Sequence, residues 1–444
     1  MIDTYRNIFK KLRSKGYEYY LTIYLVINVI WVFLGMFLYA YTSSFLYWDL
    51  SISYILLLII NFLIIVGLLF FKKIKFDKID VFLFLLVLFG FISTICAHDS
   101  GIALYGFKDR YEGFFQLLYY YSLMFLCTNV FKKENKKIII NFILVFSLFN
   151  VLVCIVQMFD FFKSIPIPYR GVLMGQGFIT NPNFFGSYMV LCLSLSMGLF
   201  LYNSKHNWIY LIFCIFLYSA LLMSSALSGM VGLFFVGLCN LVYFIYLLIK
   251  KCVTKLLIIK HIVLIISFIF VSIILSYLGK TAITGDIIRL TKETNEITKG
   301  NFDDSYGSGR MFVWKNTLKI VPNHFFNGIG VDNFFYAFGD KPLYKQNKDD
   351  VIFFDKAHNE YLQKLVCEGI FSCITYISML LVVFFSSVKK IFKEKNYIII
   401  GLFLSFVGYS VQAFFNISVI EVAPLFWIAC GLLYDRNFKL KKRL

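Results

Sequence analysis

Long apolar stretches recur along this chain of 444 residues and limit the folds open to it. A run of about 18 or more apolar residues with few or no charges is typical of a transmembrane helix. The chain contains about twelve such runs, and it is 60% hydrophobic but only 15% charged. A soluble domain carries about 25% charged residues. We therefore predict an all-α polytopic membrane protein with about twelve transmembrane helices.

The predicted spans cover approximately 20–42, 51–71, 79–97, 113–131, 138–159, 183–202, 208–223, 226–249, 261–279, 357–388, 396–414 and 420–434. They divide the chain into a basic N-terminus (1–19), transmembrane helices 1–9 (20–279), a large loop (280–356), transmembrane helices 10–12 (357–434) and a basic tail (435–444). The large loop is by far the longest polar segment. We expect it to contain short helices.

The net charge of +18 is explained by topology. If the N-terminus lies inside and the loops alternate, basic clusters such as 72–78, 132–137 and 250–260 all fall on the inner side, while the outer loops are close to neutral. This is the positive-inside asymmetry. It predicts a multi-pass protein of the cytoplasmic membrane with both termini in the cytoplasm and the large loop outside. The basic excess therefore does not indicate a nucleic-acid partner.

Cysteines and acidic pairs give no sign of a disulfide framework or a metal centre. All cysteines except Cys252 lie in predicted spans, and none lies in a predicted outer loop. No stretch has the ligand spacing of a zinc site. Asp303 and Asp304 could hold a divalent cation, but one acidic pair in a loop is weak evidence. We therefore expect no metal and no cofactor.

Two outer segments before the large loop contain candidate binding residues. Arg110 lies at the outer start of the fourth span, in GFKDRYEGFFQLL, where it could pair with its neighbours at the membrane interface. Arg170 precedes Asn181-Pro182-Asn183 in IPYRGVLMGQGFITNPNFFGS. Asn caps helices well and Pro suits the first turn, so this stretch predicts a well-capped helix. Alternatively, the helix N-terminus and Arg170 form an anion site.

The large loop and the residues after it contain two further candidates. In DDSYGSGRMFVWKNTLKI, Ser308 is predicted to cap a helix that runs to about Ile320 and carries Arg310 and Trp314 on one face. In AHNEYLQKLVCEG, His358 lies near the outer start of the tenth span. A neutral histidine is suited to act as a general base, because its unperturbed pKa is about 6.5. A histidine at a helix start in the headgroup region is the structural alternative.

These candidates meet on the predicted outer side of a chain with very little charge in its spans. A lipid diphosphate suits such a surface, because its anionic headgroup lies at that depth while its tail stays in the bilayer. Arginine is the residue suited to bidentate contact with phosphate. No ATP is available on the outer face, so a sugar transfer there requires an activated donor. A glycan linked to a polyprenyl diphosphate carries its own leaving group.

The chain resembles the O-antigen ligase/polymerase family of bacterial membrane glycosyltransferases. The resemblance rests on RGVLMGQGFITNPNFFGSYM, on GSGRMFVWKNTLKI…NGIGVDNF followed by AHNEYLQKLVCEGIFS, and on FNISVIEVAPLFWIACG, and it covers approximately residues 80–434. It implies metal-independent transfer of a glycan from undecaprenyl diphosphate to an acceptor hydroxyl or amine on the outer side. By position, His358 matches the essential histidine of the family and Arg310 its loop arginine. Their implied roles are acceptor activation and diphosphate neutralisation.

The chain departs from the family at one position. Family ligases often have a further arginine in a Ser-Arg pair at the outer start of the eighth span, where this chain has Leu227 in SSALSGMVG. We expect Arg170 to supply the missing charge, with Arg110 as the alternative. The acceptor is expected to be a glycan, a lipid or a wall polymer. Contacts to acceptor or sugar are expected from Asn181, Asn183, Trp314, Asn359 and Glu360.

Two other functions fit the spans equally well. The alternative function is a lipid-linked oligosaccharide flippase, which is expected to place charges inside its spans, whereas the charges here gather in outer loops. A scaffold or sensor without catalysis is the third possibility. Within the enzyme hypothesis, the residues leave ligase and polymerase undecided.

Overall fold

The computed structural model describes residues 16–42, 45–71, 76–108, 110–159, 174–339, 343–346, 351–434 and 436. Within these residues the longer helices are α2 (Tyr17–Thr42), α3 (Phe45–Phe70), α4 (Lys78–Ile95), α7 (Lys133–Phe159), α8 (Pro182–Leu201), α10 (Leu227–Ile249), α11 (Lys255–Tyr277), α14 (Glu360–Glu394) and α15 (Tyr397–Gln412). The shorter helices are α5 (Ser100–Tyr105), α6 (Phe114–Cys127), α9 (Ile209–Met223), α12 (Ile283–Thr298), α13 (Arg310–Ile320) and α16 (Ala423–Leu433).

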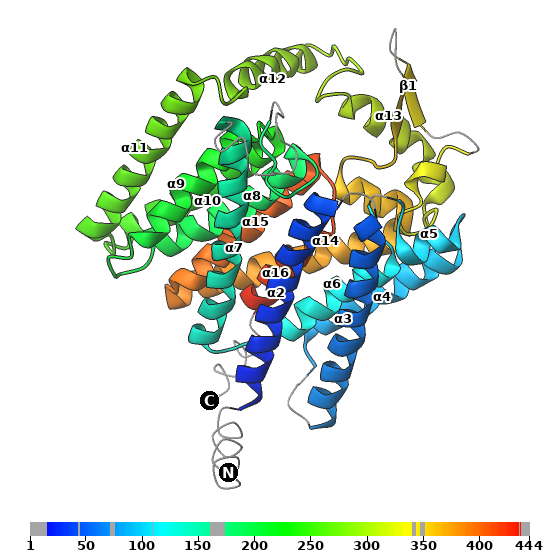
Figure 1. Ribbon diagram of the computed structural model, residues 1–444, viewed down its shortest axis with the longest axis horizontal. Helices are drawn as coiled ribbons and strands as arrows, with labels where there is room; N and C mark the ends of the chain where they lie inside the picture. The colour runs from blue at the N-terminus through cyan, green and yellow to red at the C-terminus, as the bar shows by residue number, and fades with distance from the viewer. Residues whose placement is uncertain are drawn as a thin grey trace.

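The prediction of an all-α polytopic membrane protein is confirmed. In the described part of the chain, nine helices are long and apolar enough to cross a membrane. Three shorter apolar helices, α6, α9 and α16, occupy the positions of the remaining predicted spans. The shorter three are packed among the longer helices, so their backbone groups are bonded within protein rather than exposed to lipid. Figure 1 shows the helices as one bundle, with α12, α13 and β1 at one end, which we call the loop end.

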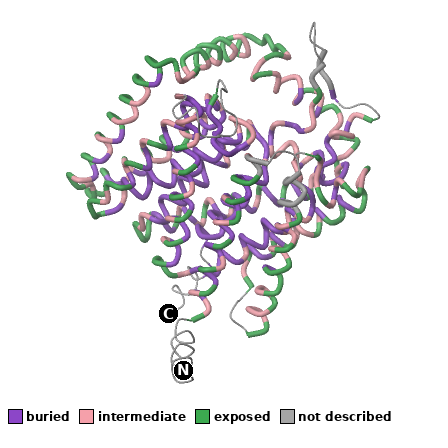
Figure 2. Tube along the Cα trace, in the orientation of Figure 1, coloured by how far each residue is buried: buried purple, intermediate pink, exposed green. Residues whose placement is uncertain are grey.

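The centre of the bundle is built on α8, which packs against α9, α10 and α15. A helix that is apolar all round is buried on every side, and nearly every residue of α8 is buried (Figure 2). Its closest neighbour is α15. A Cβ atom on Gly198 would lie 2.3 Å from the Cα atom of Gly401, so only glycine allows this approach. The central helices therefore form a tightly packed frame for the loop end.

The large loop is attached to α14 through backbone hydrogen bonds. A break at Gly369 (φ 83°) divides α14 and exposes backbone groups there. The Ile370 amide donates to the Phe325 carbonyl at 2.8 Å, and the Ile329 amide donates to the Val366 carbonyl at 3.0 Å. A Cβ atom on Gly328 would lie only 2.2 Å from the Cys367 carbonyl oxygen, so this close approach requires glycine. The loop is thus docked on the helix that begins just after His358.

Two expectations for the loop differ from the structure. Helix α13 does end at Ile320, but its N-cap is Gly309 in the left-handed conformation and no side chain caps it, so the predicted Ser308 cap is wrong. Ser308 itself has φ 59°, and its backbone belongs to the turn that precedes the helix. The loop also contains an unpredicted antiparallel hairpin of β1 (Leu343–Gln346) and β2 (Val351–Phe354). Three short 3₁₀ segments, η1 (Val321–His324), η2 (Phe334–Tyr336) and η3 (Ala413–Phe415), complete the fold.

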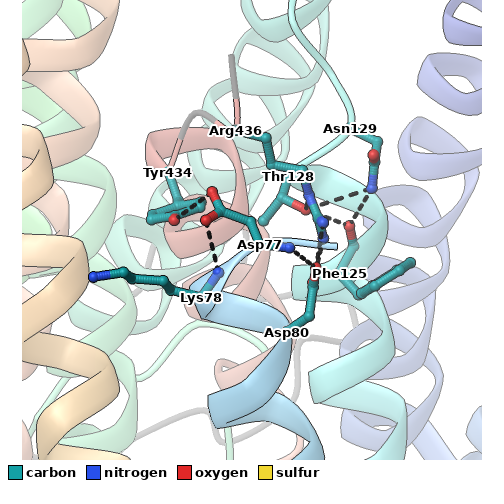
Figure 3. Close-up of polar contacts among 8 residues, drawn as sticks. All are labelled: Asp77, Lys78, Asp80, Phe125, Thr128, Asn129, Tyr434 and Arg436. Atoms are coloured by element: carbon teal, nitrogen blue, oxygen red, sulfur yellow. Dashed lines mark hydrogen bonds and ion pairs between the residues drawn. The ribbon is translucent and has the colours of Figure 1, made fainter. Parts of the chain in front are cut away.

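A buried ion pair ties the chain together at the end of the bundle opposite the loop end. The Arg436 guanidinium contacts both carboxylate oxygens of Asp80 at 2.5 Å, and its Nε donates to the Thr128 hydroxyl at 2.7 Å. Tyr434 donates to Asp77 at 2.8 Å beside it (Figure 3). The Asp80 carboxylate also caps the start of α4 by accepting the Asp77 amide. This cluster joins the start of α4, the end of α6 and the chain that follows α16.

Removing Arg436 should destabilise the protein strongly. Breaking a buried ion pair by deleting one partner costs about 3–5 kcal/mol, because the other charge is left uncompensated. Arg436→Ala should therefore lower the melting temperature clearly in detergent, and the Asp80→Asn/Arg436→Gln double variant should recover part of the loss. Lys78→Gln, which removes a charge at the same helix start, serves as the control. An Arg436→Ala protein as stable as the parent would contradict a structural role for the pair.

Candidate active site

His358 lies in the short connection between β2 and α14. Its backbone is in the left-handed conformation (φ 49°), which residues other than glycine adopt rarely. Residues on both sides hold this conformation. The Trp314 indole donates to the Ala357 carbonyl at 3.0 Å, and the Asn359 side chain caps α14 by accepting the amides of its first turn. The imidazole is thus positioned by α13 and by the start of α14.

Positive charges surround the imidazole. Burial lowers the pKa of His358 to about 4, and the positive charge of Arg310 acts in the same direction. Arg110 and Lys356 lower the pKa further, while the Asp355 carboxylate opposes them. The ring is therefore neutral at physiological pH and has a free lone pair. A neutral imidazole can accept a proton, which a charged one cannot.

Arg110 connects three parts of the loop end. Its Nε lies 2.8 Å from Oδ2 of Asp355, and both side chains are about three-quarters buried. Its guanidinium carbon lies 5.5 Å from the centre of the Phe184 ring, in the first turn of α8. The connection between α5 and α6 is thereby joined to the start of α8 and to the segment that carries His358. Asp355 partly neutralises Arg110, so the anion-binding capacity of the cluster is greater at Arg310.

Arg310, the first residue of α13, has an unsatisfied donor. Its Nη1 donates to the Gly307 carbonyl at 3.1 Å, but within the described residues its buried Nε has no hydrogen-bond partner. A buried unsatisfied donor costs about 1–3 kcal/mol, and more when it is charged. Burial and the positive charge of the nearby Arg289 lower the pKa of Arg310. An anion beside Arg310 would satisfy both the donor and the charge.

A small polar cavity of about 60 Å³ lies next to this cluster, among α6, α14 and α16. Its charged lining residues are Glu112, Asp332, Lys356, Glu360, Lys364 and Glu368. Lys356 forms an ion pair with Asp332, and Lys364 pairs with Glu368 at 2.6 Å. A volume of this size holds a few water molecules. It is too small for a diphosphate or a sugar.

The carboxyl groups of Glu112 and Glu360 bond to tyrosine hydroxyls in this cavity. Tyr120 donates to Glu112 at 2.5 Å, and Tyr376 donates to Glu360 at 2.6 Å. Burial raises the pKa of Glu112. Burial also lowers the pKa of Lys356 to about 8, although the Glu112 charge opposes this. Lys356 thus joins the cavity electrostatically to His358.

The structure brings together His358, Arg310 and Arg110, which lie far apart in the sequence. Trp314 contacts the same segment through Ala357. Asn359 and Asn181 serve as N-caps of α14 and α8, and Glu360 faces the polar cavity rather than the imidazole cluster.

Other predicted positions lie apart from the cluster or outside the described residues. The Asn183 carbonyl accepts a hydrogen bond from Asn416 at 3.1 Å. Leu227 is the first residue of α10, and Arg170 lies outside the described residues. Asp304 pairs with Lys315 at 3.3 Å. Across the described ranges, no group of three or more His, Cys, Asp or Glu side chains is placed to hold a metal ion.

Four charged residues of the site were missed by sequence reasoning. Asp355 and Lys356 directly precede Ala357 and His358, so their proximity was a usable signal. Glu112 lies two residues after Arg110, so its proximity was a usable signal as well. Arg289 lies on α12, which has no buried residue, and no pattern in the sequence relates it to Arg310.

The imidazole should titrate well below its ordinary range when no anion is bound. We expect the pKa of His358 to be near 4, and we expect Arg310→Gln to raise it toward 6.5, because one repelling cation is removed. The measurement is a pH titration of histidine NMR signals in detergent, with the His358 signal assigned by its loss in His358→Gln. A pKa of 6.5 or above in the unliganded parent protein would contradict the electrostatic arrangement.

Comparison with known families gives one match. Residues 190–377 match the O-antigen ligase family. The matched segment runs from within α8 to the middle of α14, so it contains Arg310, Trp314 and His358 but not Arg110 or Asn181. A comparison with curated proteins finds no match.

Proposed function

We propose that this chain transfers a glycan from undecaprenyl diphosphate to an acceptor on the outer face of the cytoplasmic membrane. The match of residues 190–377 to the O-antigen ligase family, which acts in surface polysaccharide biosynthesis, supports the proposal. The observation that carries the proposal is the unsatisfied, buried Nε of Arg310 beside a neutral His358. A site of this kind combines a place for an anionic leaving group with a base for the acceptor.

In this mechanism the diphosphate of the donor lies against Arg310, with Arg110 and Lys356 contributing positive charge nearby. His358 takes the proton of the acceptor hydroxyl or amine. The acceptor atom forms a bond to the anomeric carbon, and the bond from that carbon to the diphosphate oxygen breaks with its electron pair on the leaving group. The negative charge on the diphosphate increases as this bond breaks, so the cations stabilise the transition state more than the bound donor.

Donor binding would also activate the base. In the unliganded site burial lowers the pKa of His358 to about 4 and the cations add to this effect, which makes the ring a weak base. A bound diphosphate places negative charge among the same cations and offsets their effect, so the pKa of His358 rises toward physiological pH. General bases are most effective when their pKa lies near the working pH. Proton transfer is thereby restricted to the donor-bound enzyme.

The flippase alternative predicts charges inside the spans, and the structure does place Lys364 and Glu368 within α14. These two side chains are paired with each other, and the adjoining cavity measures about 60 Å³. In this structure the cavity is too small to hold a lipid-linked glycan. The paired charges inside α14 line the same cavity as Lys356.

Replacing the proposed base should abolish transfer without preventing donor binding. His358→Ala should lower the rate of transfer by about 10²–10⁴-fold, the usual contribution of a general base. Turnover is measured in proteoliposomes with a lipid-linked donor and a separately added acceptor. The melting temperature of each variant is measured as well. His324→Ala, a histidine of η1 in the same loop, is the matched control. Normal turnover in a folded His358→Ala protein would eliminate the base assignment.

Kinetics can separate the role of the positive charge of Arg310 from the role of its planar pair of hydrogen-bond donors. Arg310→Lys keeps a positive charge but loses the planar pair of donors, so we expect a higher KM for the donor and a lower kcat. Arg310→Gln should be more severely impaired in both. If labelled donor crosses the membrane in the absence of acceptor, and neither variant changes the rate of this crossing, the result would favour the transporter instead.

The choice between polymerase and ligase depends on the acceptor. A strain lacking the protein should accumulate single lipid-linked repeats if the enzyme is a polymerase, and long lipid-linked chains if it is a ligase. Mass spectrometry of extracted lipid-linked glycans distinguishes the two. Unchanged lipid-linked and released glycans would contradict both.

A further inference from the structure

The end of the bundle opposite the loop end contains a second site, an amphipathic cavity with two chambers. The apolar chamber, of about 290 Å³, is formed by α10, α14 and α15 and includes Leu238 and Phe392. The polar chamber, of about 390 Å³, extends from the end of α8 to the start of α11 and includes Asn203 and Lys395. Tyr202, Tyr243 and Ile400 line both chambers. The two chambers therefore adjoin each other.

The polar chamber contains an amide that lacks a partner. Asn203 is 4% exposed, and in the described part of the chain its side-chain Nδ2 has no hydrogen-bond partner. Its Oδ1 is already occupied, since it accepts the Lys205 amide at 3.1 Å. A buried donor of this kind costs about 1–3 kcal/mol if it stays unsatisfied. An acceptor atom of a ligand in the chamber would satisfy it.

The charge around the polar chamber is positive. Lys260 is fully buried beside it and donates to the backbone carbonyls of Asn203 at 2.7 Å and Lys205 at 3.0 Å. Within the described residues no ion pair joins Lys260 to a carboxylate. Lys395 lies at the mouth with its Nζ 3.0 Å from the Cys252 sulfur. Glu394 is the acidic side chain next to Lys395 in the chain, and it is exposed. The cations thus outnumber the anions at this site.

We propose that this cavity binds an anionic phospholipid of the cytoplasmic leaflet, with an acyl chain in the apolar chamber and the phosphate in the polar chamber near Asn203 and Lys395. Basic pockets between transmembrane helices on the cytoplasmic side are suited to anionic headgroups. By the positive-inside rule this end of the bundle faces the cytoplasm. The site lies about 30 Å from the His358 cluster, since α8 separates them at 1.5 Å per residue. It is therefore distinct from the donor site.

The proposal is tested on the purified full chain by native mass spectrometry and by thermal unfolding. Phosphatidylcholine vesicles with and without phosphatidylglycerol are the probes. We expect phosphatidylglycerol to remain bound selectively and to raise the melting temperature saturably. Lys395→Gln should weaken this binding at least fivefold. Leu238→Trp, which fills the apolar chamber from a lipid-exposed position, should weaken it as well.

The matched control is Lys389→Gln, which removes an exposed charge from the same end of α14 without touching the cavity. Equal loss in Lys389→Gln and Lys395→Gln would show general attraction to an anionic surface and overturn the site. Full stabilisation by inorganic phosphate would overturn the proposed lipid, because the acyl chain would then contribute nothing. Equal effects of phosphatidylcholine and phosphatidylglycerol would overturn the requirement for negative charge. Glycan transfer is not involved in any of these measurements.

Discussion

The structure depends on the pairing of charges that are held away from water. Each buried charge must be compensated, because an isolated ion in a medium of low dielectric is several kcal/mol less stable than in water. Arg436 with Asp80 and Lys364 with Glu368 satisfy this requirement within the fold. Arg310 does not, since its buried Nε has no partner in the described residues. The paired charges therefore support the fold, whereas Arg310 is available to a ligand.

The position of Arg310 relative to His358 depends on backbone contacts rather than on side chains alone. The loop after α13 is docked on the break at Gly369, where the Ile370 amide reaches the Phe325 carbonyl at 2.8 Å. Trp314 then bonds from α13 to the residue before His358. The segment that carries His358 is thus held by α13 on one side and by the start of α14 on the other. Precision of this kind is needed if a base and an anion site are to act on the same bond.

Much of the fold could be predicted from the sequence, because apolar runs report directly on burial in a bilayer. The N-cap of α8 at Asn181 was also predictable, since asparagine before proline is a local signal. The Gly309 cap and the β1–β2 hairpin were not, because both depend on how the loop docks on α14. His358 and Arg310 could be placed on one face. Their electrostatic coupling to Lys356 required the three-dimensional arrangement.

The same electrostatics relates the resting state of the site to its reaction. Burial, together with the cations that would attract a diphosphate, lowers the pKa of His358 to about 4, so the imidazole of the empty site is a weak base. A bound diphosphate would offset the effect of the cations on the pKa of His358, because it would lie among these charges. Without a bound anion, burial keeps the imidazole neutral and weakly basic. In the proposed reaction, binding of the donor and activation of the acceptor are coupled through one set of charges.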